Sequence, residues 1–229
     1  MKRCLVAIVT LVTLLLPVIC VATPASPGAY VSGFAGIHVP SGTDVPSIDF
    51  LTNRSFSDRV EFDPGINIGG TGGYDFGIVR LEGELSYKNA EIKSITNQAT
   101  GERFRNEDGN LGVLAMMFNG FIDLHNDSPV TPYLGGGIGF AAMHLSDTFG
   151  IRTSGGAAQS LLLYGTGDDT VFAYQVGTGL DIAMNRHFSL DVGYRYFGSS
   201  RADFSSDQAI SASLRYESHA GALGFRYRF

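Results

Sequence analysis

Residues 79–88 read Val79-Arg80-Leu81-Glu82-Gly83-Glu84-Leu85-Ser86-Tyr87-Lys88, with apolar side chains or glycine at odd positions and polar side chains at even positions. A period of two is typical of a β-strand that has one apolar and one polar face. In a soluble protein the apolar face would turn toward the core, whereas in a small membrane barrel it would turn toward lipid. This stretch alone leaves both interpretations open.

The same alternation recurs along the chain and predicts eight strands. They are Tyr30–Val39, Phe62–Phe76, Ile78–Ser94, Asn110–Leu124, Val130–His144, Thr170–Met184, Phe188–Gly198 and Ser213–Phe229. The connections alternate in length, with long ones at 40–61, 95–109, 145–169 and 199–212 and short ones around 77, 125–129 and 185–187. A membrane barrel with short periplasmic turns and longer outside loops has this arrangement. We therefore predict an all-β fold, an eight-stranded antiparallel up-and-down transmembrane β-barrel.

The fifth connection leaves an alternative open. It contains Gln159-Ser160-Leu161-Leu162-Leu163-Tyr164, which is apolar enough to hide two more strands. A ten-stranded barrel would have a wider lumen. The first strand is also ambiguous, because either Val31, Ala35, Ile37 and Val39 or Tyr30 and Phe34 could face lipid.

The N-terminal segment has the features of a signal peptide. Lys2 and Arg3 precede an apolar run from Leu5 to Val21, and small residues follow it. We predict a signal peptide at residues 1–22, although cleavage after Ala25 fits equally well, and a barrel at 23–229. The alternatives are an uncleaved membrane anchor and a lipoprotein, for which Ile19 before Cys20 is a poor match.

Composition narrows the possible partners. Both cysteines, Cys4 and Cys20, lie in the predicted signal, so the mature chain offers no disulfide or thiolate metal site. Without Lys2 and Arg3 the chain has 14 basic and 22 acidic residues, a net charge of −8, which disfavours nucleic acid as a partner. We expect no cofactor and no metal site, export to the outer membrane of a Gram-negative cell, contact with its lipid, and a monomer.

The polar positions of the predicted strands should point into the lumen. Eight strands leave an interior that side chains fill, so charges there must pair. Arg195 is expected to pair with Asp191 or Asp181. The predicted lumen charges are Arg80, Glu82, Glu84, Lys88, Asp181, Asp191, Arg195, Arg226 and Arg228.

Several motifs in order resemble those of one known family. They are Gly73-Tyr74-Asp75-Phe76-Gly77 before Val79–Tyr87, Asn119-Gly120-Phe121-Ile122-Asp123 before Pro132–Gly139, Ala173–Asp181 before Ser189–Tyr196, and the C-terminal Gly224–Phe229. Together they resemble the outer-membrane β-barrel family of OmpA-type barrel domains and opacity-like small surface proteins. The resemblance implies that the alternating aromatics Phe225, Tyr227 and Phe229 form the signal that the barrel-assembly machinery reads.

No catalytic site stands out, and we expect no enzyme. Some eight-stranded barrels are lipid A enzymes with a His and a Ser two residues apart, a spacing found here at His187 and Ser189, but on a short turn and without a neighbouring Glu. The glycines of Gly135–Gly139 precede no helix, so strand curvature explains them better than a phosphate loop does. The leading hypothesis is a non-enzymatic surface protein, structural or adhesive, that acts on host or environmental ligands through four extracellular loops. A narrow channel for small solutes and a lipid A-modifying enzyme are the alternatives.

Overall fold

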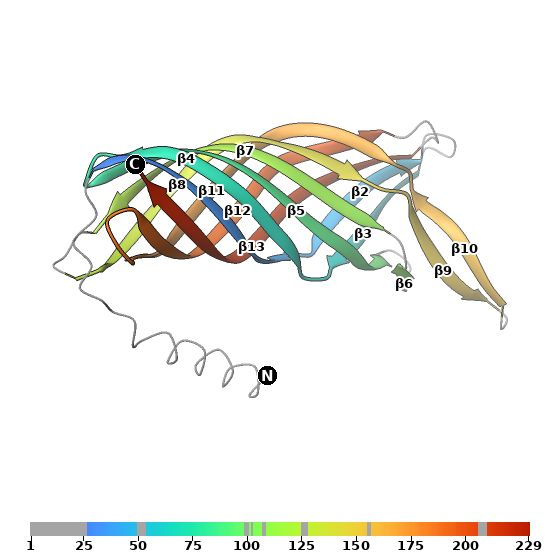
Figure 1. The fold of residues 1–229 in the computed structure, drawn as a ribbon. Helices are drawn as coiled ribbons and strands as arrows, with labels where there is room; N and C mark the ends of the chain where they lie inside the picture. The colour runs from blue at the N-terminus through green and yellow to red at the C-terminus, as the bar shows by residue number, and fades with distance from the viewer. Residues whose placement is uncertain are drawn as a thin grey trace.

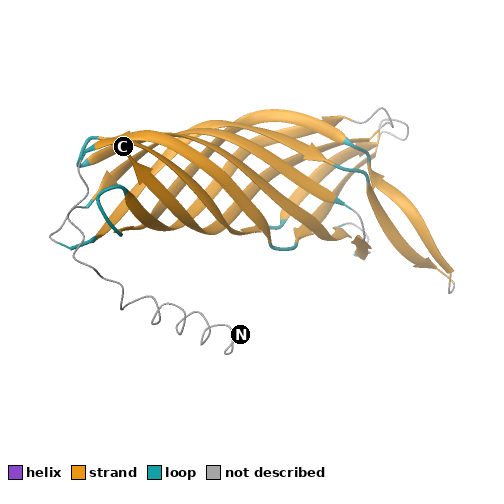
Figure 2. Ribbon diagram, in the orientation of Figure 1, coloured by secondary structure: helices purple, strands orange, loops and turns teal. Residues whose placement is uncertain are grey.

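The computed structural model describes residues 27–49, 54–98, 101, 103–106, 109–124, 128–154, 157–205 and 210–229. The predicted signal peptide, at 1–22 or 1–25, lies outside these residues. The described chain consists of strands and their connections (Figure 2). No helix in the described part is long and apolar enough to cross a membrane.

Eight long antiparallel strands close into a barrel, as predicted. They are β1 (Gly28–Pro40), β4 (Gly65–Asp75), β5 (Val79–Asn97), β7 (Asn110–Asp123), β8 (Val130–Leu145), β11 (Gly167–Ala183), β12 (Phe188–Ser205) and β13 (Ile210–Arg228). Each pairs with the next, and β13 pairs with β1 from Tyr30↔Arg228 to Pro40↔Ser218, which closes the ring. The strands cross the barrel obliquely (Figure 1), as closure of a sheet requires.

The long connections contain five shorter strands, where the sequence predicted loops. They are β2 (Thr43–Asp49), β3 (Arg54–Phe62), β6 (Arg103–Asn106), β9 (Thr148–Ser154) and β10 (Ala157–Tyr164). These strands and the far ends of β5 and β13 form one sheet in the order β10-β9-β6-β5-β3-β2-β13. The β9–β10 hairpin projects from the end of the barrel opposite the C-terminus (Figure 1).

The fifth connection therefore does hold two strands, yet the barrel is not widened. β8 pairs directly with β11 from Gly167↔Leu145 to Ile182↔Val130, so β9 and β10 do not enter the ring. The ten-stranded alternative is wrong, because the hairpin pairs with β6 above the barrel instead of between β8 and β11.

The two faces of the wall differ as the alternation in the sequence predicts. On β5, Val79, Leu81, Leu85 and Tyr87 are exposed on the outer face, and the even positions from Arg80 to Lys88 are buried inside. The first strand is no longer ambiguous, because the odd positions Val31, Ile37 and Val39 are exposed on the outer face. Tyr30 is buried inside, and Phe34 shares its face.

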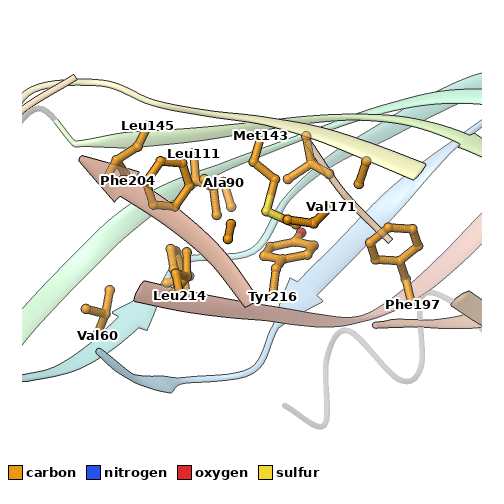
Figure 3. Packing of buried hydrophobic residues seen from close by; sticks show 14 of the residues in the cluster. Val60, Ala90, Leu111, Met143, Leu145, Val171, Phe197, Phe204, Leu214 and Tyr216 are labelled. Carbon is orange, nitrogen blue, oxygen red and sulfur yellow. The ribbon is translucent and has the colours of Figure 1, made fainter. Parts of the chain in front are cut away.

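The barrel interior has two layers. The half next to the short turns holds the charged and polar side chains, here called the polar layer: Tyr30, Arg80, Glu82, Glu84, Lys88, Asn119, Asp123, Tyr133, Gln175, Asp181, Asp191, Arg195, Arg226 and Arg228. The half next to the long connections holds a packed apolar cluster, here called the apolar layer (Figure 3): Val45, Val60, Phe62, Ala90, Ile92, Ile95, Leu111, Val113, Ala115, Met117, Ala141, Met143, Leu145, Val171, Ala173, Phe197, Ala202, Phe204, Leu214 and Tyr216.

The polarity of the wall inverts between the two layers. On β5 the outward positions change from Tyr87 to Glu91 and Lys93, while the inward positions change from Lys88 to Ala90 and Ile92. β13 changes in the same way, since inward Leu214 and Tyr216 alternate with Arg215 and Glu217. On these two strands the half with the short turns is thus apolar outside and polar inside, and the other half has the arrangement of a water-soluble protein.

Candidate functional site

The centre of the polar layer is a cluster of two carboxylates, two amides and one guanidinium. Arg195 on β12 donates to Glu84 on β5, and its second terminal nitrogen lies 3.7 Å from Glu82. Asn119 and Gln175 donate to Glu84 Oε2 over 3.0 and 2.8 Å, and Gln175 also donates to Asn119. The cluster therefore joins four strands across the lumen through charge-assisted hydrogen bonds.

A second cluster lies at the end of the barrel where the chain ends. Arg226 donates to Asp181 and lies 3.5 Å from Asp191, and Arg228 donates to Asp181 over 3.1 Å. Ser189 donates to the same Asp181 carboxylate over 3.1 Å. Three strands are thus held together around one buried carboxylate.

Arg80 connects the two clusters through aromatic rings. Its guanidinium lies 3.2 Å from Asp123 and sits over the rings of Phe121 and Tyr133, 4.9 and 4.7 Å from their centroids. Tyr30 donates to Glu82 over 2.6 Å, and Tyr133 donates to Asp191 over 3.0 Å. These phenols carry the network from one carboxylate cluster to the other.

Lys88 stands at the boundary between the layers. Its ammonium donates to Ser86 over 3.2 Å and lies 4.3 Å from the ring centroid of Phe197 in the apolar layer. Beside the boundary, His38 contacts the Asn89 carbonyl at 3.1 Å and the Tyr216 hydroxyl at 3.0 Å. No carboxylate of the described chain lies within 4.0 Å of the Lys88 ammonium. Hydrogen bonds and a cation–π contact therefore hold the polar groups at this boundary.

The structure places all nine sequence-predicted lumen charges inside the barrel and corrects one pairing. Arg195 pairs with Glu84 and Glu82, whereas Asp181 and Asp191, its expected partners, are paired by Arg226. Strand register explains the difference: Asp181 faces Asp191 across β11 and β12, next to the C-terminal arginines, and Arg195 lies four residues further along β12. Alternation shows which face a residue takes but not its height against strands elsewhere in the ring.

Sequence reasoning missed several members of the network. The network also contains Asn119, Asp123, Tyr133 and Gln175. The prediction from the sequence named charged residues, so it left out the uncharged Asn119, Tyr133 and Gln175. Their signal was available, since each lies on the inward-facing set of its strand.

Two glycines make room for this network. A Cβ at Gly179 would lie 2.5 Å from the Tyr133 hydroxyl, and one at Gly137 would lie 2.0 Å from Asn119 Oδ1. Gly137 belongs to the glycine-rich run Gly135–Gly139, which lies within strand β8 and opens no helix. Its glycines thus serve the close approach of neighbouring strands.

The two residues with catalytic spacing lie on different faces of the wall. The exposed His187 ring stacks on Tyr227 with centroids 6.1 Å apart, while the Ser189 side chain is buried on Asp181. Within the described chain, no three His, Cys, Asp or Glu side chains are grouped so that they could hold a metal ion.

Comparison with known proteins gives the family. A family model described as "Outer membrane protein beta-barrel domain" matches residues 11–229. The chain belongs to the outer membrane protein β-barrel family. Outer membrane protein PagN of Salmonella typhimurium is 27% identical over 90% of this chain and 91% of its own length.

Solved structures of low sequence identity share the fold of this family member. The outer membrane protein OprG from Pseudomonas aeruginosa superposes with a TM-score of 0.56 at 13% identity, covering 90% of this chain and 98% of that one. Neisserial surface protein A superposes with a TM-score of 0.50 at 19% identity, covering 88% and 97%. The family and the named relatives place this barrel in the outer membrane of Gram-negative bacteria.

Membership of an outer-membrane family explains why the wall inverts. The apolar outer belt runs on β5 from Val79 to Tyr87, nine residues, which suits a strand crossing a bilayer. Exposed aromatics mark its two edges: Tyr74, Phe76, Phe188, Tyr227 and Phe229 at the short-turn edge, and Tyr87, Tyr174 and Tyr194 at the other. The polar layer therefore lies at membrane depth. The apolar layer begins within the belt, where buried Met117 lies between exposed Met116 and Phe118, and continues beyond it.

The predicted assembly residues lie on the short-turn edge of the belt. Phe225, Tyr227 and Phe229 are all exposed on the outer face, and the rings of Tyr227 and Phe229 meet edge to face with centroids 5.3 Å apart. The Phe229 amide donates to the Ala29 carbonyl over 3.1 Å, so the last residue is held against the first strand.

Proposed function

We propose that this protein is a non-enzymatic surface protein, structural or adhesive, whose working part is the sheet built at the long-connection end. The observation that carries the proposal is the two-layered lumen, which is packed with side chains in both layers, while the extra strands of the described chain gather at the long-connection end. A filled barrel is suited to anchoring and to display. The polar layer holds the barrel strands together, and the extra sheet presents the contact surface.

Filling of the lumen argues against the channel alternative. In the polar layer, side chains from β5, β7, β11 and β12 meet at the Glu84 carboxylate. Beyond it, the apolar layer leaves a pocket of about 20 Å³ lined by apolar side chains, among them Phe62, Leu145 and Phe204. A pocket of this volume holds about one water molecule, which favours a closed lumen over a channel.

The proposed orientation puts the short turns in the periplasm and the long connections outside the cell. Outer-membrane barrels have short periplasmic turns and longer extracellular loops. Two exposed ion pairs connect strands of the sheet at the long-connection end, Arg59 with Asp44 at 3.2 Å and Arg103 with Glu61 at 2.9 Å. An ordered extracellular sheet favours contact with other surfaces over a purely flexible coat.

Deletion of the β9–β10 hairpin tests this proposal. The hairpin can be replaced by a short Gly-Ser turn after Asp147 without touching the pairing of β8 with β11. We expect the barrel to reach the outer membrane in normal amount, while attachment of cells to a host-cell or matrix-coated surface falls. Equal attachment at equal surface amount contradicts an adhesive role for this hairpin.

Assembly and processing complete the proposal. The exposed aromatic series at the C-terminus is proposed to be read by the barrel-assembly machinery after export on a cleaved signal peptide. The barrel is proposed to work as a monomer in lipid, because its ring of strands is closed without a partner.

A further inference from the structure

Two arginines face each other across neighbouring strands, just beyond the apolar belt. Arg201 on β12 is in register with Arg215 on β13, and both side chains are exposed on the outer face. A bulge in β12 between Gly198 and Arg201 sets this register. Directly opposed like charges on adjacent strands destabilise a sheet, so the pairing calls for a compensating anion.

The protein itself supplies little compensation. Within the described part of the chain, no carboxylate lies within 4.0 Å of either guanidinium. The nearest acids on the same two strands and the same face are Asp203 and Glu217, each two residues and so about 7 Å along its strand. The exposed Asp44 lies on β2, the strand that pairs with β13, and its Oδ1 accepts from Arg59 over 3.2 Å and from Gln98 over 2.7 Å. By contrast, the exposed Arg59 and Arg103 of the same sheet both have carboxylate partners.

The height of the two arginines above the apolar belt indicates where a compensating anion would come from. The exposed ring of Tyr194 on the belt edge contacts His219, with its hydroxyl 2.6 Å from Nδ1. Arg215 lies four residues beyond His219, which in a strand tilted by about 40° is roughly 10 Å higher. Arginine side chains reach back toward the interface from such a height, into the headgroup region.

We propose that Arg201 and Arg215 bind a phosphate group on the saccharide headgroup of the outer-leaflet lipid. Two planar guanidinium groups side by side can each donate two hydrogen bonds to one phosphate monoester, and this geometry is specific to arginine. The proposal rests on the proposed orientation, in which this rim lies outside the cell. Bound phosphate would relieve the repulsion between the arginines and join β12 to β13 at the point where the bulge interrupts their pairing.

The test measures lipid binding by the folded full-length protein in a detergent with a sugar headgroup, which brings no phosphate of its own. A fluorescently labelled lipopolysaccharide, the same lipid after dephosphorylation, and inorganic phosphate as competitor are compared. The variants are Arg201→Gln, Arg215→Gln and both together. The matched control is Arg186→Gln, an exposed arginine on a short turn at the opposite end.

We expect each single glutamine variant to bind the phosphorylated lipid about tenfold more weakly, the size of one lost charge-assisted interaction. Arg186→Gln should bind like the wild type, and dephosphorylation should erase the difference between wild type and variants. Equal binding by the wild type and the double variant overturns the proposal. An equal loss of lipid binding in Arg186→Gln also overturns it, because that would indicate unspecific charge attraction. Competition by inorganic phosphate at concentrations as low as those of the lipid overturns it as well.

A charge reversal gives a second readout that does not rely on affinity. Arg215→Glu places a carboxylate opposite Arg201, so without phosphorylated lipid its thermal unfolding should occur at a higher temperature than that of the wild type. With the phosphorylated lipid the order should reverse. An unchanged order overturns the proposal, and because both assays are made in micelles, their result is separate from the test of orientation in cells.

Discussion

Replacement of Arg195 by leucine should strongly destabilise a barrel that still forms. The substitution keeps an apolar stem of similar length but removes the guanidinium that pairs with Glu84 and Glu82. The Arg195 side chain is 16% exposed and that of Glu84 is 1% exposed, so solvent replaces little of what is lost. Glu84 would then be a buried carboxylate without a cationic partner in contact.

The expected loss of folding free energy depends on the hydrogen-bond donors that Glu84 retains after the substitution. Removing one partner of a buried pair costs about 3–5 kcal/mol. Glu84 retains the amide donors of Asn119 and Gln175, so we expect the lower end, about 3 kcal/mol, a factor of roughly 100 in the folding equilibrium constant. The exposed pair of Arg59 with Asp44 provides the control, and Arg59→Leu should cost no more than about 1 kcal/mol.

Urea unfolding in phospholipid vesicles measures these free energies, with the band shift between folded and unfolded barrel on unheated gels as readout. The double variant Arg195→Leu with Glu84→Gln removes the stranded charge together with its partner. Its loss should therefore be smaller than the sum of the two single losses by about 1–3 kcal/mol. Additive losses, or equal costs at Arg195 and Arg59, would refute the argument that the pair is buried and coupled.

Three further predictions concern topology, assembly and packing. Epitope tags in the long connections, near Gly42, Gly101, Gly155 and Asp207, should be labelled on intact cells. Tags in the short turns, near Asn126 and Asn185, should not be labelled, and labelling there would show that the barrel has the opposite orientation. Deleting Phe229 should lower the amount of barrel in the outer membrane while export to the periplasm continues, as fractionation would show, and normal barrel yield would contradict its role as a signal. Gly179→Leu should destabilise the barrel by about 1–3 kcal/mol in urea unfolding, since its Cβ would meet the Tyr133 hydroxyl at 2.5 Å, whereas Gly72→Ala, with nothing within 4 Å of the added Cβ, should change the stability little.

The ring of eight strands was predictable because the belt forces a strict alternation. Each residue such as Leu85 or Phe225 must face lipid and each neighbour such as Glu84 or Arg226 must face the lumen, so the pattern persists over nine or more residues. The alternation in connection length then gives the topology. Both signals come from the bilayer and act on every strand in the same way.

The strands beyond the membrane were not predictable by the same criterion. Where water replaces lipid, the outward positions become polar, as at Glu91 and Lys93, and the inward ones become apolar, as at Ile92. Loop-like composition then conceals short strands such as β2 and β3, which pair with each other as a hairpin and are fixed in the sheet by β13 and β5. The inversion of polarity at Asn89 was nevertheless present in the sequence, and it marks where β5 leaves the membrane.

Pairing within the lumen depends on the shear of the ring. Glu84 and Arg195 are 111 residues apart and meet across the interior from strands that are not neighbours. Their relative height is the sum of the register offsets between all intervening strands, so one uncertain register changes every cross-lumen partner. Membership of the polar layer could therefore be predicted, and the identity of each pair could not.

Electrical recording from the folded protein in a planar bilayer tests most directly that the lumen is closed. The proposed function requires that the polar layer, crossed by the contacts of Arg195 and Arg226, and the apolar layer together block a continuous water path. We expect no steady current, or only rare small openings, after insertion is verified. Stable conductance in most insertions, with ion selectivity that changes when Glu82 and Glu84 are both replaced by glutamine, would contradict it and establish a channel.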